Sequence, residues 1–180
     1  WAGTSKGIFN FGGAFATYGA NQTPSCVRFT DRIRGVEGLW IGTDSGLLRQ
    51  STSGSIEALD GSLLPGYDPN TGTSPRVNFA VRVDGQIWVG TSHGVGRYEL
   101  NGEPAGALQG VFDEPVDVLS FEQYGQDIWL GTANHGLRRR NDAGQWEPPY
   151  TTASTSDFLV SNQITGLAIR GDILWISTPS

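Results

Sequence analysis

Two histidines, His93 and His135, are the first candidates for metal ligands in this sequence, and each directly precedes a glycine in a turn-like segment. Their near-equivalent places would allow the two imidazoles to face each other and bind a metal ion. The neighbouring turns hold Lys6 and Asp44, however, and no His-x-His or His-x-x-x-His spacing is present. We therefore interpret both histidines as turn residues and expect no metal and no other cofactor.

The carboxylates and the potential nucleophiles are scattered through the sequence. Glu114, Asp117 and Glu122 form no tight pair that would serve as general acid and base. The segment Asp68-Pro-Asn-Thr-Gly72 has turn chemistry but lacks the ligand spacing of a calcium loop. Cys26 is the single cysteine and lies in an apolar, strand-like setting, which favours a buried small side chain over a catalytic thiol. These observations predict a protein that is not an enzyme.

Charge and hydropathy argue against two further classes of protein, nucleic-acid binders and membrane-inserted proteins. The formal net charge is −6, and the one dense basic run is Arg138-Arg139-Arg140, so a nucleic-acid partner is not expected. No segment approaches the roughly 18 apolar residues of a membrane-spanning helix, so this segment should not insert into a membrane. Asn21-Gln-Thr23 matches the acceptor sequence for N-glycosylation, which matters only in an exported protein.

An internal repeat determines which elements would position these residues. A Trp-x-[Gly or Ser]-Thr motif begins at residues 1, 40, 88, 129 and 175, a period of about 43 residues. An apolar segment and a short turn precede each internal copy, and a Gly-apolar segment follows it. A fourth, weaker segment such as Gln145-Trp-Glu147 comes next. We divide the chain into one domain of repeats at approximately 1–38, 39–86, 87–127 and 128–173, with the start of a fifth copy at 174–180.

Three strong strands and one weak strand per repeat predict an all-β fold, a β-propeller of about four four-stranded blades. The Trp strand should be buried on both faces between neighbouring blades, and the Gly of the motif should permit close approach of a neighbouring blade. The Thr hydroxyl should bond into the following turn, where the next Gly supplies a positive φ.

The repeat resembles the two-component regulator propeller family, with Ile87 to Tyr98 and Ser161 to Thr178 as the closest matches. Ser177 departs from the family's glycine in the last copy. The resemblance implies an exported sensor domain, periplasmic or extracellular, that recognises a glycan. It also implies that the blades can belong to a larger ring, for example of about seven blades. Closure of the chain on itself at four blades is the alternative, and an open piece would expose apolar blade faces that seek partners.

We predict a binding propeller whose partner is a carbohydrate or a protein. A structural protein that self-associates at a cell surface or in a filament is the second hypothesis, and a propeller lyase or glycosidase is the third. The ligand should bind at the rim formed by the turn after each Trp strand and the segment entering each first strand. The candidate residues at this rim are Lys6, Asp44, Ser45, Arg76, His93, Asn134, His135 and Asn162, with Ser5, Ser92 and Glu114 beside them.

Overall fold

The computed structural model describes residues 2–4, 7–9, 27–156 and 158–179. All regular secondary structure in these ranges consists of β-strands. In chain order the strands are β1 (Ala2–Thr4), β2 (Gly7–Phe9), β3 (Val27–Asp31), β4 (Leu39–Thr43), β5 (Gly46–Gln50), β6 (Ile56–Ala58), β7 (Val77–Val83), β8 (Gln86–Thr91), β9 (Gly94–Tyr98), β10 (Pro104–Ala107), β11 (Val118–Tyr124), β12 (Asp127–Thr132), β13 (Leu137–Arg140), β14 (Gly166–Arg170) and β15 (Ile173–Ser177).

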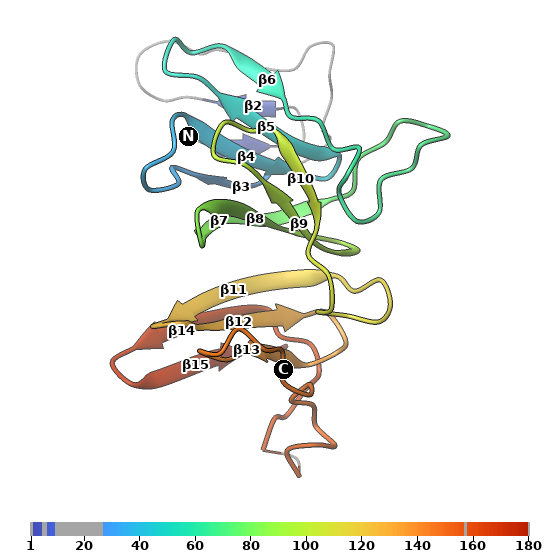
Figure 1. Ribbon diagram of the computed structural model, residues 1–180, viewed down its shortest axis with the longest axis vertical. Coiled ribbons are helices and arrows are strands. Elements are labelled where there is room, and N and C mark those ends of the chain that lie inside the picture. The colour runs from blue at the N-terminus through green and yellow to red at the C-terminus, as the bar shows by residue number, and fades with distance from the viewer. Residues whose placement is uncertain (1, 5–6, 10–26, 157, 180) are drawn as a thin grey trace.

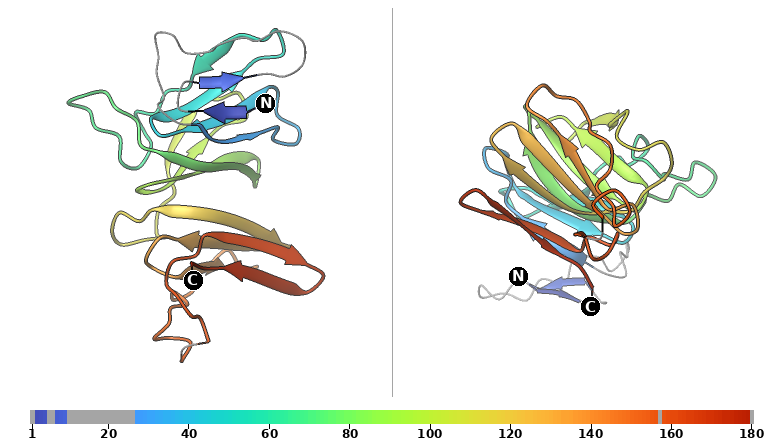
Figure 2. Two further views of the ribbon diagram at one scale, coloured as in Figure 1. Left: turned by 180° about the vertical axis from the view of Figure 1, so that it is seen from behind. Right: turned by 90° about the horizontal axis from the view of Figure 1, so that it is seen from below.

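These strands form five antiparallel sheets in which neighbours in the chain are neighbours in the sheet: β1–β2, β3–β6, β7–β10, β11–β13 and β14–β15. The sheets are stacked in chain order (Figures 1 and 2). The first strands of successive sheets, β3, β7, β11 and β14, contact one another. Stacked antiparallel meanders of up to four strands, with their first strands together, are typical of the blades of a β-propeller, so the predicted fold class is confirmed. The repeat boundaries drawn from the sequence stay a prediction.

The motif tryptophans form the core between sheets, and their burial falls along the chain. Trp40 on β4 is fully buried, Trp88 on β8 is 4% exposed, and Trp175 on β15 is 60% exposed. The ring of Trp40 packs edge-to-face on Tyr98 of the next sheet, with 6.3 Å between centroids. Trp88 packs on Trp146, again from the next sheet, with 6.5 Å between centroids. The predicted burial between blades is therefore correct wherever a following sheet covers the tryptophan.

The motif threonine closes the turn between the second and third strands of each sheet. The hydroxyl of Thr91 donates to the carbonyl of Gly94 at 3.0 Å and accepts the backbone N–H of His93 at 3.0 Å. Thr43 and Thr132 make the same pair of bonds in their own turns. Gly94 has a φ of 135°, which a side chain would strain. Both predicted roles, for the threonine and for the following glycine, are confirmed.

The motif glycine has the predicted role at one position and a different role at two others. A Cβ on Gly131 would lie 2.6 Å from Ile164, which lies in the segment entering the next sheet, so this glycine permits the predicted close approach. A Cβ built on Gly42 would lie 1.9 Å from the ring of Phe29, and one on Gly90 would lie 2.1 Å from the ring of Phe79. Both phenylalanines belong to the first strand of the same sheet, not to a neighbouring blade. At these two positions the glycine therefore makes room for a ring within its own sheet.

The Ser that replaces this glycine in the last copy follows from the same constraint. Ser177 pairs with Gly166, so here the first strand carries the small residue and the Trp strand carries the larger one. A Cβ on Gly166 would lie 2.7 Å from the Ser177 hydroxyl. Compared with the preceding sheet, where Ser120 of the first strand pairs with Gly131, the serine and the glycine have exchanged strands.

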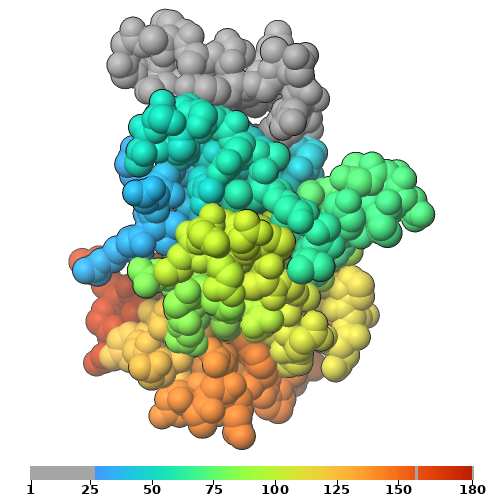
Figure 3. All heavy atoms as spheres, turned by 45° about the horizontal axis from the view of Figure 1, so that its top comes forward, coloured from blue at the N-terminus to red at the C-terminus, as the bar shows by residue number. Residues whose placement is uncertain are grey.

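The outer strands are less regular than predicted. The segment around Gln145–Glu147 contributes an isolated bridge between Arg140 and Trp146 instead of a fourth strand. The long loop 59–76 between β6 and β7 projects from the stacked sheets (Figure 3).

Candidate functional site

The turns between the second and third strands of successive sheets lie on one side of the stack, together with the loops that enter the sheets. We call this side the turn rim. It consists of the turns 43–46, 91–94 and 132–136 and the loops 59–76, 108–117 and 151–163. Backbone hydrogen bonds tie two of these turns to entering loops. The N–H of Ser92 donates to Arg76 O at 3.0 Å and that of Ala133 to Asp117 O at 2.9 Å, each within one sheet, and that of Gly136 donates to Asn162 O of the loop that enters the next sheet, at 2.9 Å. These bonds join neighbouring turns and loops, and the role of the rim in ligand binding stays a prediction.

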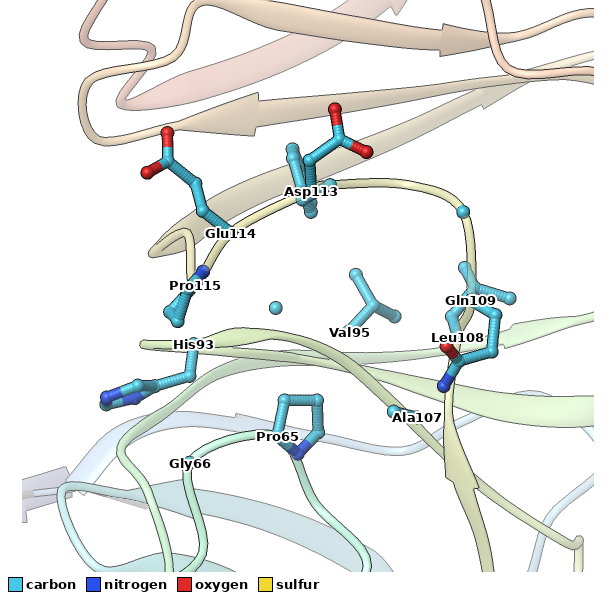
Figure 4. Close-up of a pocket in the computed structure, with 13 residues that line it drawn as sticks. Pro65, Gly66, His93, Val95, Ala107, Leu108, Gln109, Asp113, Glu114 and Pro115 are labelled. Atoms are coloured by element: carbon cyan, nitrogen blue, oxygen red, sulfur yellow. The ribbon is translucent and has the colours of Figure 1, made fainter.

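The larger rim cavity lies between the β7–β10 sheet and the loop that enters β11, and it has a volume of about 390 Å³. Pro65, Val95, Leu108 and Phe112 supply apolar walls, and His93 lies at its edge. In Figure 4 the carboxylates of Asp113 and Glu114 point away from Pro65 and His93. The cavity therefore offers a largely apolar floor with polar groups around it, which is the usual composition of a ligand site.

His93 is held at this edge by close packing on loop 59–76. A Cβ built on Gly66 would lie 2.5 Å from the His93 ring, and Gly66 itself has a φ of 90°. The Ser92 hydroxyl lies 2.9 Å from His93 Nδ1. The imidazole is therefore oriented by its neighbours while its side chain stays exposed.

A second rim cavity of about 270 Å³ lies on the other side of the segment Phe112–Glu114. Asn134, His135 and Arg138 line it together with that shared segment. Since the same three residues border both cavities, the two form one composite surface made by two successive sheets, β7–β10 and β11–β13, and the loops beside them.

His135 and Glu114 connect the β11–β13 sheet to its own entering loop. His135 Nε2 lies 2.7 Å from Glu114 Oε1, and His135 Nδ1 lies 2.6 Å from Asn134 Oδ1. Contacts to both ring nitrogens hold the imidazole in place between Asn134 and Glu114. This pair fixes the wall between the two cavities.

Arg138 is the cationic group of the second cavity. Its guanidinium stacks over the Phe112 ring at 5.8 Å, and its Nε is buried without a hydrogen-bond partner in the described part of the chain. Burial lowers the pKa of the Arg138 guanidinium, opposed by the charge of Asp113. A stacked cation with unused donors is suited to bind an oxygen-bearing ligand group.

The other predicted rim residues have structural partners. Arg76 forms an ion pair with Asp117, which also accepts a 2.8 Å hydrogen bond from the Asn78 amide. The Asn162 side chain accepts the N–H of Thr152 at 2.8 Å and so holds loop 151–163 in place. These contacts place Arg76 and Asn162 at the rim but outside the walls of both cavities.

Asp44 and Ser45 lie in the β4–β5 turn, outside the walls of both cavities, and Ser45 donates its N–H to Thr43 Oγ1 at 3.1 Å. Lys6, the proposed glycosylation residue Asn21 and Cys26 lie outside the described residues. The sequence interpretation missed Pro65, Phe112 and Asp113 as wall residues, and it treated Arg138 only as part of a basic run. A loop segment carries no periodicity from which its inward-facing residues could be found.

The described residues contain no group of three or more His, Cys, Asp or Glu side chains that could hold a metal ion. No helix in the described ranges is long and apolar enough to cross a membrane. What the rim geometry provides is an apolar floor, a stacked arginine, two histidines and two carboxylates around adjoining cavities. This arrangement can bind a polar ligand that also has an apolar face.

No family model matches the chain, and no curated protein matches it. Among solved structures it is similar to the extracellular domain of the putative one component system BT4673 from B. thetaiotaomicron, at 20% identity and a TM-score of 0.63 over 84% of this chain and 20% of that one. The extracellular domain described as the putative hybrid two component system BT4673 gives 18% identity and a TM-score of 0.65, over 91% of this chain and 22% of that one. The computationally designed Ika4 protein gives 13% identity and a TM-score of 0.54, over 83% of each chain.

This chain therefore spans about a fifth of the length of the two natural domains it resembles. At such low identities the similarity establishes the fold alone. The blade stacking and the structural neighbours together identify the chain as a set of β-propeller blades.

Proposed function

We propose that this chain is a non-catalytic binding module that recognises a glycan, or else a protein segment, at the turn rim. The observation that carries the proposal is the composite surface formed by the two adjoining cavities, which share the segment Phe112–Glu114. Two successive sheets and their connecting loops contribute to it, so the propeller scaffold holds its walls in fixed relation. Extracellular location of the structural neighbours supports a periplasmic or extracellular place for this chain as well.

A glycan fits the side chains of this surface best. Sugar rings combine an apolar face with hydroxyl groups, and the rim combines Pro65, Val95 and Phe112 with imidazole, amide and guanidinium donors. Arg138 lines the second cavity beside the Phe112 ring, so its terminal guanidinium nitrogens can donate to a hydroxyl or carboxylate of the ligand. The same groups would accept a peptide with polar side chains, which is the alternative ligand.

A glycan microarray probed with the labelled full chain tests this proposal. We expect a restricted set of saccharides to bind, and we expect Arg138→Ala to weaken binding of the strongest one by about tenfold or more, as for loss of a hydrogen bond to a charged group. Arg170→Ala is the matched control, because Arg170 is exposed on β14 beside the turn at Gly171, at the opposite end of the sheets.

Two results would count against the glycan proposal. One is the absence of any saccharide signal above background for the folded chain. The other is equal binding by the wild type and Arg138→Ala, because the ligand would then lie away from the composite surface.

A further inference from the structure

Two opposite charges line the second rim cavity without forming an ion pair. Asp113 and Arg138 both belong to the walls of this cavity of about 270 Å³. Burial lowers the pKa of the Arg138 guanidinium and the charge of Asp113 opposes that effect, so the carboxylate lies near enough to act on the guanidinium. Within the described residues, however, no salt bridge joins the two groups and neither side chain makes a hydrogen bond.

The other charged wall groups of this cavity are already in contact with each other. His135 Nε2 lies 2.7 Å from Glu114 Oε1. The two arginines that follow Arg138 on β13 both form ion pairs with carboxylates. Asp113 and Arg138 are therefore the charged groups of the cavity wall whose hydrogen-bonding capacity is open to a ligand.

The positions of both groups are set by the segment Phe112–Glu114 and by β13. In Figure 4 the Asp113 carboxylate points away from Pro65 and His93 of the larger cavity, which is consistent with its place in the wall of the second one. The Arg138 guanidinium stacks over the Phe112 ring at 5.8 Å. Because Phe112 directly precedes Asp113, the ring that carries the cation belongs to the same segment as the carboxylate. A cationic donor and an anionic acceptor are thus held in one cavity.

We infer that Asp113 and Arg138 together bind two adjacent hydroxyl groups, a vicinal diol, of an uncharged saccharide. One hydroxyl donates its proton to the Asp113 carboxylate, and the neighbouring hydroxyl oxygen accepts a hydrogen bond from a terminal nitrogen of Arg138. The inference rests on the proposed recognition of a glycan at the turn rim, and it names the chemical class of that glycan.

The charges of the cavity wall disfavour an ionised ligand. Asp113 and Glu114 are acidic, whereas Arg138 is the one basic residue besides His135 among the wall residues. A uronate or sulfate group that approached Arg138 would be repelled by Asp113, and an ammonium group that approached Asp113 would be repelled by Arg138. A diol avoids both repulsions, because it donates to one group and accepts from the other without a net charge.

A glycan array prepared in two copies tests the inference. One copy is treated with periodate, which cleaves the carbon–carbon bond of vicinal diols, and then with borohydride, which reduces the resulting aldehydes. The other copy receives borohydride alone. We expect the labelled full chain to bind uncharged saccharides most strongly on the second copy, and we expect their signals to fall by about tenfold or more after periodate.

Substitutions place the diol between the two side chains. Asp113→Ala should weaken binding of the strongest saccharide by about tenfold or more, and it should leave the fold intact because Asp113 is exposed. Arg138→Ala breaks the same bridged contact, so the loss in the double variant should be smaller than the product of the two single losses. Asp142→Ala is the matched control, because Asp142 is exposed in the turn after β13 and outside the walls of both rim cavities.

The outcomes separate this inference from the proposed function. Absence of any saccharide signal on the copy without periodate would overturn both. Four results would overturn the diol while saccharide recognition stands: equal signals of the strongest saccharide on the two copies, unchanged binding by Asp113→Ala, a double-variant loss equal to the product of the single losses, or strongest binding of a saccharide that carries a uronate or sulfate group.

Discussion

Gly90 lies beneath the ring of Phe79, and a methyl group added at residue 90 has no room. The added Cβ would lie 2.1, 2.5 and 2.6 Å from three ring carbons, whereas carbon atoms in contact are separated by about 3.5–4.0 Å. The ring cannot move freely, because it packs on Phe121 of the next sheet at 5.9 Å between centroids. We therefore expect Gly90→Ala to lower the free energy of unfolding by about 1–3 kcal/mol, the usual range for an overpacked core.

A double-mutant cycle isolates the cause. Phe79→Ala alone should also destabilise the fold, by about 3 kcal/mol for loss of a partly buried ring. In that background the alanine at residue 90 has space, so Gly90→Ala should cost nearly nothing. The two changes should then couple by about 1–3 kcal/mol, as expected for residues in direct contact.

Urea unfolding followed by tryptophan fluorescence gives the free energy of unfolding of the wild type, the two single variants and the double variant. The dependence of this free energy on urea concentration should be the same in all four proteins. Additive effects, or a wild-type midpoint for Gly90→Ala, would refute the steric reasoning.

Three further predictions concern the turn, the core and the strand edge. Thr91→Val keeps the shape of the side chain but leaves the backbone N–H of His93 without its acceptor, so it should destabilise the fold by about 1–3 kcal/mol in urea unfolding. Burial raises the pKa of the Tyr98 phenol above its ordinary value of 10.0, so the unfolded chain releases this proton first and stability should fall as the pH rises above about 10. Tyr98→Phe should reduce that fall, measured as the difference between urea midpoints at pH 8 and near pH 11. Arg139→Ala removes a guanidinium 5.3 Å above Trp129 and paired with two carboxylates, and it should lower the free energy of unfolding by about 1–2 kcal/mol.

Each of these predictions has a contradicting result. An unchanged midpoint for Thr91→Val would mean that the turn does not depend on the hydroxyl. The same alkaline loss of stability in Tyr98→Phe and wild type would assign the effect to other tyrosines. Destabilisation of Arg139→Ala that disappears in high salt would indicate screened surface charge without a stacking contribution.

The sequence predicts the parts of the fold that recur. The tryptophan strand, the threonine-closed turn and the positive φ of Gly94 are each imposed by local geometry, and each is repeated, so the pattern is visible without the structure. The contact of Gly90 with Phe79 escapes this reasoning. It depends on a register shift between Val77 and Phe79, where one strand carries an extra residue.

The rim walls could be predicted only in part. His93 and His135 lie in turns that follow from the repeat, so the sequence indicates where they lie, and their part in ligand binding stays a prediction. Phe112 and Arg138 define the second cavity through a stacking contact between a loop and a strand. Loop conformation depends on what the loop packs against, so no spacing in the sequence indicates this contact.

Histidine side-chain NMR provides the most direct test of recognition at the turn rim, because the sequence contains two histidines and both border the composite surface. The experiment records ¹H–¹⁵N imidazole spectra of the full chain while the saccharide with the strongest array signal is added. Recognition at the turn rim predicts that the resonances of both His93 and His135 shift and saturate together. Saturable binding with both imidazole spectra unchanged would contradict it.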